Sequence, residues 1–320
     1  MSSNARKLIV ILGIICIIGF TVLAIISLYF FNVAINRKTV IVFEDNTPKE
    51  APEPLPTPID VKGTKWVEQQ GYETWNIKTG DGLFLKAYFI KAKERSNKTV
   101  ILAHGYTSQG KDMGSFAKYY YSKLGYNVLM PDDRGHGQSE GNYIGFGWLD
   151  RKDYLQWIDK VIESEGEDSQ IVLHGISMGG ATVMMVSGET LPLQVKAIIE
   201  DCGYTSVLDQ LKFQLKQMYD LPEFPILNAT SLMTKIRAGY FFEEASALNQ
   251  VKKDKLPMLF IHGDQDTFVP TEMVYKLYDA CNAPKDLLVV KGAGHAMSYH
   301  EAKKEYQKKI KSFLKKYIKD

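Results

Sequence analysis

One short segment, Ile171–Ala181 (IVLHGISMGGA), constrains the fold of this 320-residue chain more than any other. Its first four residues form strands readily, and they lead into a turn in which Gly175 and Gly179 flank Ser177 before a helix-forming stretch. A turn this tight lifts the serine hydroxyl clear of the sheet and leaves no room for side chains at the flanking positions. The following helix directs free N–H groups at the serine, which favours an anionic intermediate. The segment predicts a nucleophilic serine; the simpler interpretation is a serine that only caps the helix.

Strand-like and helix-like patterns alternate along the rest of the chain. A hairpin signal at Thr79–Gly82 joins predicted strands over Tyr72–Lys78 and Leu83–Ile90. A hairpin followed by repeated strand–helix units predicts an α/β fold, with a mostly parallel central sheet covered by helices on both faces. Sites in such sheets lie at the carboxyl ends of the strands. The further predicted strands are Thr99–Ala103, Val128–Met130, Ile171–Leu173, Val195–Ile199, Met258–Ile261 and Leu287–Val290, and the predicted helices are Ser115–Leu124, Trp148–Glu165, Thr271–Cys281 and Tyr299–Ile318.

The stretch Asp209–Asn249 interrupts this alternation, because it is rich in apolar residues and contains no clear strand. An insertion between two strands at their carboxyl ends would lie over the site, so we predict a small helical cap over residues 205–250. Its apolar side chains either form a small core of their own or line a pocket for an acyl chain. Both interpretations stay open.

An uncharged apolar run of 24 residues, Leu8–Phe31, follows Arg6 and Lys7 near the amino terminus. It is long enough to span a bilayer as one helix, whereas a cleaved signal peptide has a shorter apolar core and a small-residue cleavage site. We predict a short tail (1–7) and a single-pass membrane anchor (8–31). Because a short tail precedes a large folded domain, we expect that domain to lie outside the cytoplasm, although Arg37 and Lys38 follow the anchor.

Prolines recur between Thr47 and Pro58, a pattern that favours extended polyproline II structure. We therefore interpret residues 32–60 as a spacer that lifts a domain over residues 61–320 off the membrane.

The formal net charge of +2 argues against a nucleic-acid partner. The cysteines Cys16, Cys202 and Cys281 show no metal or redox spacing, so we expect neither a metal nor an organic cofactor.

Three loops at predicted carboxyl ends of strands supply groups that a nucleophilic serine needs. The loop after Thr99–Ala103 directs the backbone N–H of Tyr106 at the site, and the N–H of Met178 follows the serine, so both are expected oxyanion donors. The loop after Met258–Ile261 offers two acids, of which Asp266 is preferred and Asp264 is the reserve. His295 lies on a Gly-flanked loop after the last strand and is the expected base.

The chain order Ser177, Asp266, His295 is the order that the α/β-hydrolase fold uses. Together with His104-Gly105, Asp133–Ser139 and the HGDQDTFVP and GAGH segments, it makes residues 66–320 resemble bacterial α/β hydrolases of the serine aminopeptidase-like and lysophospholipase/monoglyceride-lipase-like group. The resemblance implies that Asp133–Ser139 is a structural turn. It also supports Asp266 as the acid, since this residue precedes the Phe-Val-Pro segment by the family's spacing.

These residues predict a serine hydrolase that cleaves a carboxylic ester of an apolar acyl substrate through an acyl-enzyme. A serine peptidase acting on short peptides is the alternative; Glu223, Glu243 and Glu244 of the cap are its unspecific candidates for holding a free amine. An alternative of another class is a catalytically inactive hydrolase domain that binds a ligand at the cell surface. The natural substrate and the oligomeric state are left open.

Overall fold

The computed structural model describes residues 3–38 and 61–319, and its centre is one eight-stranded sheet in the order β1-β2-β4-β3-β5-β6-β7-β8. The β1–β2 and β2–β4 pairs are antiparallel, and all other neighbours are parallel. The predicted α/β fold with a mostly parallel sheet is confirmed. The strands are β1 (Glu73–Lys78), β2 (Phe84–Ile90), β3 (Lys98–Ala103), β4 (Asn127–Pro131), β5 (Gln170–Ile176), β6 (Val195–Asp201), β7 (Met258–Gly263) and β8 (Lys285–Val290).

Helices cover both faces of the sheet because successive side chains of each strand point to opposite faces. In β3, Ile101 and Ala103 join one apolar core, while Val100 and Leu102 join the other. The first core is closed by α5 (Asp150–Glu165), α6 (Met178–Ser187) and α10 (Glu272–Ala280). The second is closed by α3 (Val61–Gln70), α4 (Gly114–Tyr119), η2 (Tyr120–Leu124) and α12 (Lys303–Leu314), with η1 (Gly110–Met113) and α11 (Ser298–Glu301) as short additions.

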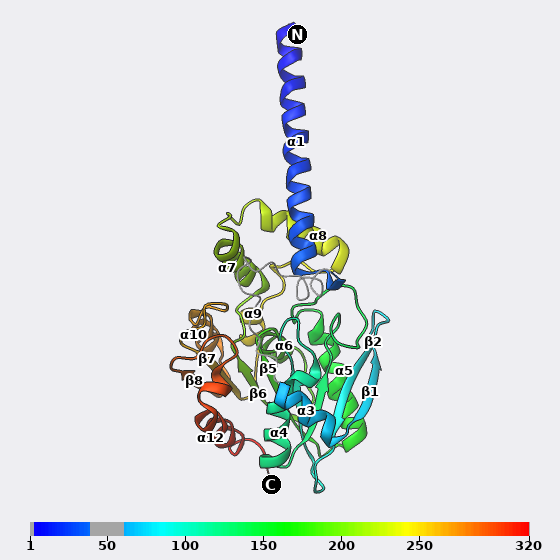
Figure 1. Cartoon of the computed structure of the whole chain (residues 1–320), viewed down its shortest axis with the longest axis vertical. Helices are drawn as coiled ribbons and strands as arrows, with labels where there is room; N and C mark the ends of the chain where they lie inside the picture. The colour runs from blue at the N-terminus through cyan, green and yellow to red at the C-terminus, as the bar shows by residue number, and fades with distance from the viewer. Residues whose placement is uncertain (1–2, 39–60, 320) are drawn as a thin grey trace.

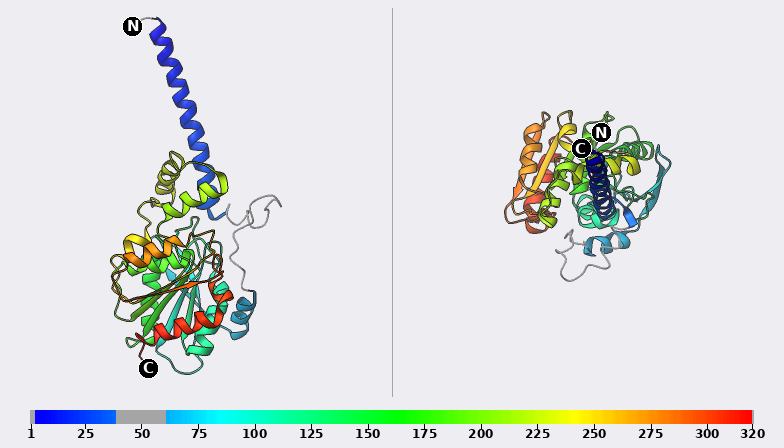
Figure 2. Two further views of the ribbon diagram at one scale, coloured as in Figure 1. Left: turned by 90° about the vertical axis from the view of Figure 1, so that its left-hand side faces the viewer. Right: turned by 90° about the horizontal axis from the view of Figure 1, so that it is seen from above.

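The cap consists of α7 (Val207–Tyr219) and α8 (Ile226–Ala238), followed by α9 (Ala247–Val251), which packs on α6. It follows β6 and lies beyond the carboxyl ends of the strands (Figure 1, Figure 2). The hydroxyl of Ser206 accepts a hydrogen bond from the backbone N–H of Asp209 at 3.0 Å, which caps the amino end of α7. The predicted helical cap is therefore present, and part of its apolar content forms a small core around Leu215, Ile226 and Leu227.

The amino-terminal helix α1 (Ser3–Ala34) projects from the cap end of the molecule (Figure 1). Among the described residues, Asn4–Ala34 forms the one helix that is long and apolar enough to cross a membrane, and an 18-residue stretch within it has a mean hydropathy of 3.2. Within the predicted spacer, the described residues contact the hydrolase domain: Ile35 is buried in the main core, and Arg37 N donates to Asn142 O at 3.0 Å. Residues 39–60, which hold the predicted polyproline segment, lie outside the described residues.

Candidate active site

Ser177 lies at the tip of the turn between β5 and α6 in a strained backbone conformation, with φ of 56°. The glycines that flank it are required sterically. A Cβ at Gly175 would lie 2.0 Å from the carbonyl oxygen of Gly179, and one at Gly179 would lie 2.1 Å from that of Ala103. These contacts confirm the tight strand-to-helix turn predicted from the sequence.

The loops after β5, β7 and β8 bring together the three side chains that the sequence singled out. His295 Nε2 lies 2.8 Å from Ser177 Oγ, and His295 Nδ1 lies 2.8 Å from Asp266 Oδ2. All three side chains are buried. In the tautomer that this arrangement requires, the serine hydroxyl donates to Nε2 and the Nδ1 N–H donates to the carboxylate.

Asp266 is held from several sides. Its Oδ1 accepts the backbone N–H groups of Phe268 and Val269 at 2.9 and 2.8 Å, and His262 Nε2 lies 3.2 Å from its Oδ2. Burial alone would raise the pKa of Asp266, but the hydrogen bonds from His262 and His295 hold it well below its usual value. The carboxylate therefore stays ionised and can orient an imidazole.

The reserve acid, Asp264, has a different partner. Its Oδ1 accepts the backbone N–H of Gly292 at 2.6 Å, which fastens the loop after β7 to the loop that carries His295. Asp264 is thus a turn residue, and the geometry selects Asp266 as the partner of His295.

Tyr106 and Met178 lie where the sequence places them, in the loop after β3 and at the first residue of α6. Their backbone N–H groups remain the predicted oxyanion donors. His104 supports the first loop: it accepts the backbone N–H of Asp133 at 3.0 Å through Nε2 and donates to Gly105 O at 2.8 Å through Nδ1. Burial lowers the pKa of His104, which keeps the neutral form that this pairing needs.

The Tyr106 side chain is fixed by a segment that the sequence analysis did not connect with the site. Its ring stacks on Phe146 with centroids 5.3 Å apart, and its hydroxyl donates to the carbonyl oxygen of Ala34 in α1 at 3.0 Å. The carboxyl end of α1 therefore lies against the side chain of a predicted oxyanion-loop residue.

The resemblance implies a structural role for the turn over Asp133–Ser139, and the contacts agree with that role. The carboxylate of the preceding Asp132 accepts the N–H groups of Gly110 and Gln138, each at 2.8 Å, and the hydroxyl of Tyr88 at 2.9 Å. The guanidinium of Arg134 pairs with Asp153 at 2.7 Å. These bonds tie the turn to β2, η1 and α5.

Sequence reasoning assigned no site role to the side chains of His262, Phe268 and Cys202. His262 supports Asp266, and the Phe268 ring packs on His295 with centroids 4.9 Å apart.

Donor atoms of Cys202, Asp266 and His295 lie within 4.8 Å of one another, a spacing that a metal ion could use. Burial raises the pKa of the Cys202 thiol well above its usual value, which opposes the thiolate that a metal would need. The HGD segment is a sequence signal for His262, whereas no local pattern marks Cys202.

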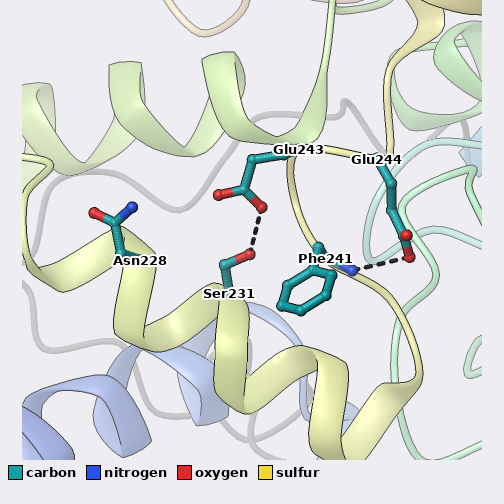
Figure 3. Close-up of a pocket in the computed structure, with 5 residues that line it drawn as sticks. All are labelled: Asn228, Ser231, Phe241, Glu243 and Glu244. Atoms are coloured by element: carbon teal, nitrogen blue, oxygen red, sulfur yellow. Dashed lines mark hydrogen bonds between the residues drawn. The ribbon is translucent and has the colours of Figure 1, made fainter.

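A cavity of about 370 Å³ lies within the cap between α8 and the loop that follows it, lined by Asn228, Ser231, Phe241, Glu243 and Glu244 (Figure 3). Its two acids already have partners. Glu243 accepts the hydroxyl of Ser231 at 2.7 Å, and Glu244 accepts the backbone N–H of Phe241 at 3.0 Å and pairs with Lys235 at 3.2 Å.

The third acid suggested for holding an amine, Glu223, pairs with Lys212 at 2.8 Å. Two of the three candidate acids for holding a free amine, Glu223 and Glu244, thus pair with lysines of the cap. A substrate amine would compete with those lysines.

Comparison with known proteins assigns the chain to a family. The model of the prolyl oligopeptidase family matches residues 113–320. The Bacillus subtilis (strain 168) protein YqkD is 30% identical over 247 residues, which cover 77% of this chain and 80% of that protein. The Schizosaccharomyces pombe protein bem46 is 25% identical, over 77% of this chain and 75% of its own length.

Among solved structures, the Pyrococcus furiosus esterase Pf2001 is 25% identical, with a TM-score of 0.64 and coverage of 86% of this chain and 97% of the esterase. The resemblance to the α/β hydrolases is therefore confirmed, along with the fold that it implies. The chain belongs to the prolyl oligopeptidase family of α/β hydrolases.

Proposed function

We propose that this protein is a serine hydrolase that cleaves a carboxylic ester with an apolar acyl group. The observation that carries the proposal is the continuous chain of short contacts from Ser177 Oγ through His295 to Asp266. A serine hydroxyl is a weak nucleophile by itself and becomes reactive when an oriented base accepts its proton. The similarity to an esterase structure supports the same activity.

In the proposed mechanism, His295 accepts the Ser177 proton while Oγ attacks the acyl carbonyl. The N–H groups of Tyr106 and Met178 stabilise the oxyanion, and each donor contributes about 3–4 kcal/mol in the transition state. His295 then protonates the leaving alcohol and activates the water that releases the acid. Asp266 holds the imidazole in the required tautomer and stays ionised throughout.

The proposal is tested by labelling the full chain with a fluorophosphonate and by measuring hydrolysis of p-nitrophenyl butyrate. We expect the wild type to be labelled and Ser177→Ala to lose both the label and nearly all turnover, by roughly 10⁴-fold or more. Ser187→Ala is the matched control, since Ser187 is a buried serine at the opposite end of the same helix. Near-full turnover by Ser177→Ala would falsify the assignment.

A peptidase acting on short peptides is the second candidate, and the family match favours it. The same triad would then release an amine instead of an alcohol. Turnover of aminoacyl-nitroanilides compared with p-nitrophenyl esters separates the two activities. The pairing of Glu223 with Lys212 and of Glu244 with Lys235 supports the esterase, because these lysines already neutralise two candidate amine-binding acids. Turnover of neither substrate class would revive the inactive, ligand-binding alternative.

We also propose that residues 8–31 anchor the protein as a single-pass membrane protein, with the hydrolase domain (61–320) outside the cytoplasm and with residues 205–250 as its cap. The length and apolarity of α1 support the anchor. So does the complete burial of Phe31 and Ile35 within the hydrolase core, because removal of a signal sequence would empty those positions. Protease added to intact cells should degrade residues 66–320. Full protection of that segment would reverse the proposed orientation.

A further inference from the structure

The carboxyl end of α1 is docked on the hydrolase domain. Ile26 and Phe30 pack against the small core of the cap, while Phe31 and Ile35 are fully buried in the main core. Further contacts continue beyond the helix: Arg37 donates to the carbonyl oxygens of Ser139 and Gly137 at 2.6 and 2.7 Å. Backbone bonds from Arg37 N to Asn142 O at 3.0 Å and from Ile144 N to Ile35 O at 2.9 Å add to the attachment. A helix held in this way sets the orientation of the domain relative to the membrane that the helix crosses.

The length of the free part of α1 sets the distance between the domain and the bilayer. Residues Leu8–Val22 are exposed, and partial burial of the helix begins at Leu23 and Ala24. At 1.5 Å per residue the 15 exposed residues measure about 22 Å, which is less than the roughly 30 Å of a hydrocarbon core. A hydrocarbon core that contains the whole exposed stretch therefore reaches the level at which α1 meets the cap.

The cap carries exposed apolar side chains. Phe224, Leu232 and Ile236 are 73%, 54% and 77% exposed, and we call these three residues the cap face. Leu232 and Ile236 are four residues apart on α8, so they share one side of that helix. α8 packs on α1 and lies beside the base of the free helix (Figure 1). Water would solvate such side chains poorly, whereas the interfacial region of a bilayer would accept them.

We propose that the cap face rests on the bilayer and that the active site takes its substrate, an acyl ester of a membrane lipid, from that bilayer. The substrate part of this inference rests on the proposed esterase function. Ser177 would attack the lipid's ester carbonyl, the lipid alcohol would leave with the proton from His295, and water would release the fatty acid. The bond from Tyr106 to Ala34 links the anchor directly to the predicted oxyanion loop beside this reaction.

The position of the cap face is tested without any activity measurement. The full chain carrying Ile236→Trp is reconstituted into vesicles that contain brominated lipids, which quench nearby indole fluorescence. We expect the emission added by this substitution to be largely lost. Leu193→Trp is the matched control, because Leu193 is 87% exposed and lies just before the amino end of β6, whereas the cap lies beyond the carboxyl ends of the strands; its emission should be retained. Equal quenching of the two variants overturns the proposal. The proposal is also overturned if a second copy of the chain covers the cap face and shields it from the lipids.

The substrate is tested with a fluorogenic long-chain ester held in the vesicles and with soluble p-nitrophenyl butyrate. We expect Leu232→Glu/Ile236→Glu to lower the rate on the vesicle ester roughly tenfold, because charges replace apolar groups at the interface. Its rate on the soluble ester should be unchanged, and Leu193→Glu should affect neither. Wild-type activity on the soluble ester alone overturns the lipid substrate, while activity on neither ester overturns the esterase itself.

Discussion

At the scale of single residues, the proposed mechanism requires Asp266 to orient His295 as the base. Its replacement by Asn keeps the size of the side chain but removes the charge that holds the Nδ1 proton. We expect Asp266→Asn to lower kcat for p-nitrophenyl butyrate by roughly 10⁴-fold. Asp264→Asn should change kcat by far less, because Asp264 bonds only a backbone N–H in the neighbouring loop. Equal losses in the two variants would contradict the choice of Asp266, and circular dichroism checks that both variants fold.

Only part of this detail follows from the sequence. Flanking glycines single out Ser177 and His295, because such flanking is visible in a short segment of sequence. The order in which these residues occur along the chain adds the family resemblance. The sequence prefers Asp266 to Asp264, with support from the family's spacing, and the tertiary contacts agree: one carboxylate faces Gly292 N and the other faces His295. The sequence marks His262 only as the first residue of a loop, and its contact with Asp266 appears only when the loop closes on itself.

At the scale of elements, α1 combines a stretch that is long and apolar enough to span a membrane with a segment of the hydrolase core. Phe31 is fully buried, whereas Phe20 on the same helix is 76% exposed. Truncating a buried Phe removes its transfer free energy and leaves a cavity, so we expect Phe31→Ala to destabilise the domain by about 3–5 kcal/mol. Phe20→Ala should leave its stability unchanged. Thermal unfolding of both full-length variants in the same detergent checks this, and equal melting temperatures would show that the helix is only a tether.

At the scale of the whole molecule, several acids are buried around the site, and they make stability depend on pH. Burial raises the pKa of Glu200 to about 8, and it raises the pKa of Asp133 to about 8 as well. A raised native pKa means that the folded state binds the proton more tightly. The stability that this tighter proton binding contributes is complete at pH values below the pKa of the acid in the unfolded chain. It is lost as the pH rises toward 8.

Glu200→Gln tests this dependence, since the amide keeps an oxygen for the N–H of Gly203, which Glu200 accepts at 3.0 Å. Between pH 5 and pH 8.5, the wild type should lose stability with rising pH. We expect the variant to lose roughly 1–3 kcal/mol less over the same range. Melting temperatures in detergent at a series of pH values provide the measurement, and parallel curves for the two proteins would rule out Glu200 as a contributor.

The sequence by itself determined the layered α/β architecture, the glycine-flanked turn at Ser177 and the presence of one long apolar helix near the amino terminus. Each of these depends on periodicity, turn chemistry or length, which neighbouring residues express locally. The docking of that helix was decided by tertiary structure alone: Ala34 meets Tyr106, and Phe31 packs on Tyr143, across long sequence separations. An apolar run satisfies the same local pattern whether lipid or protein surrounds it. Only the folded domain shows that one side of the last turns packs on protein, with Phe31 fully buried.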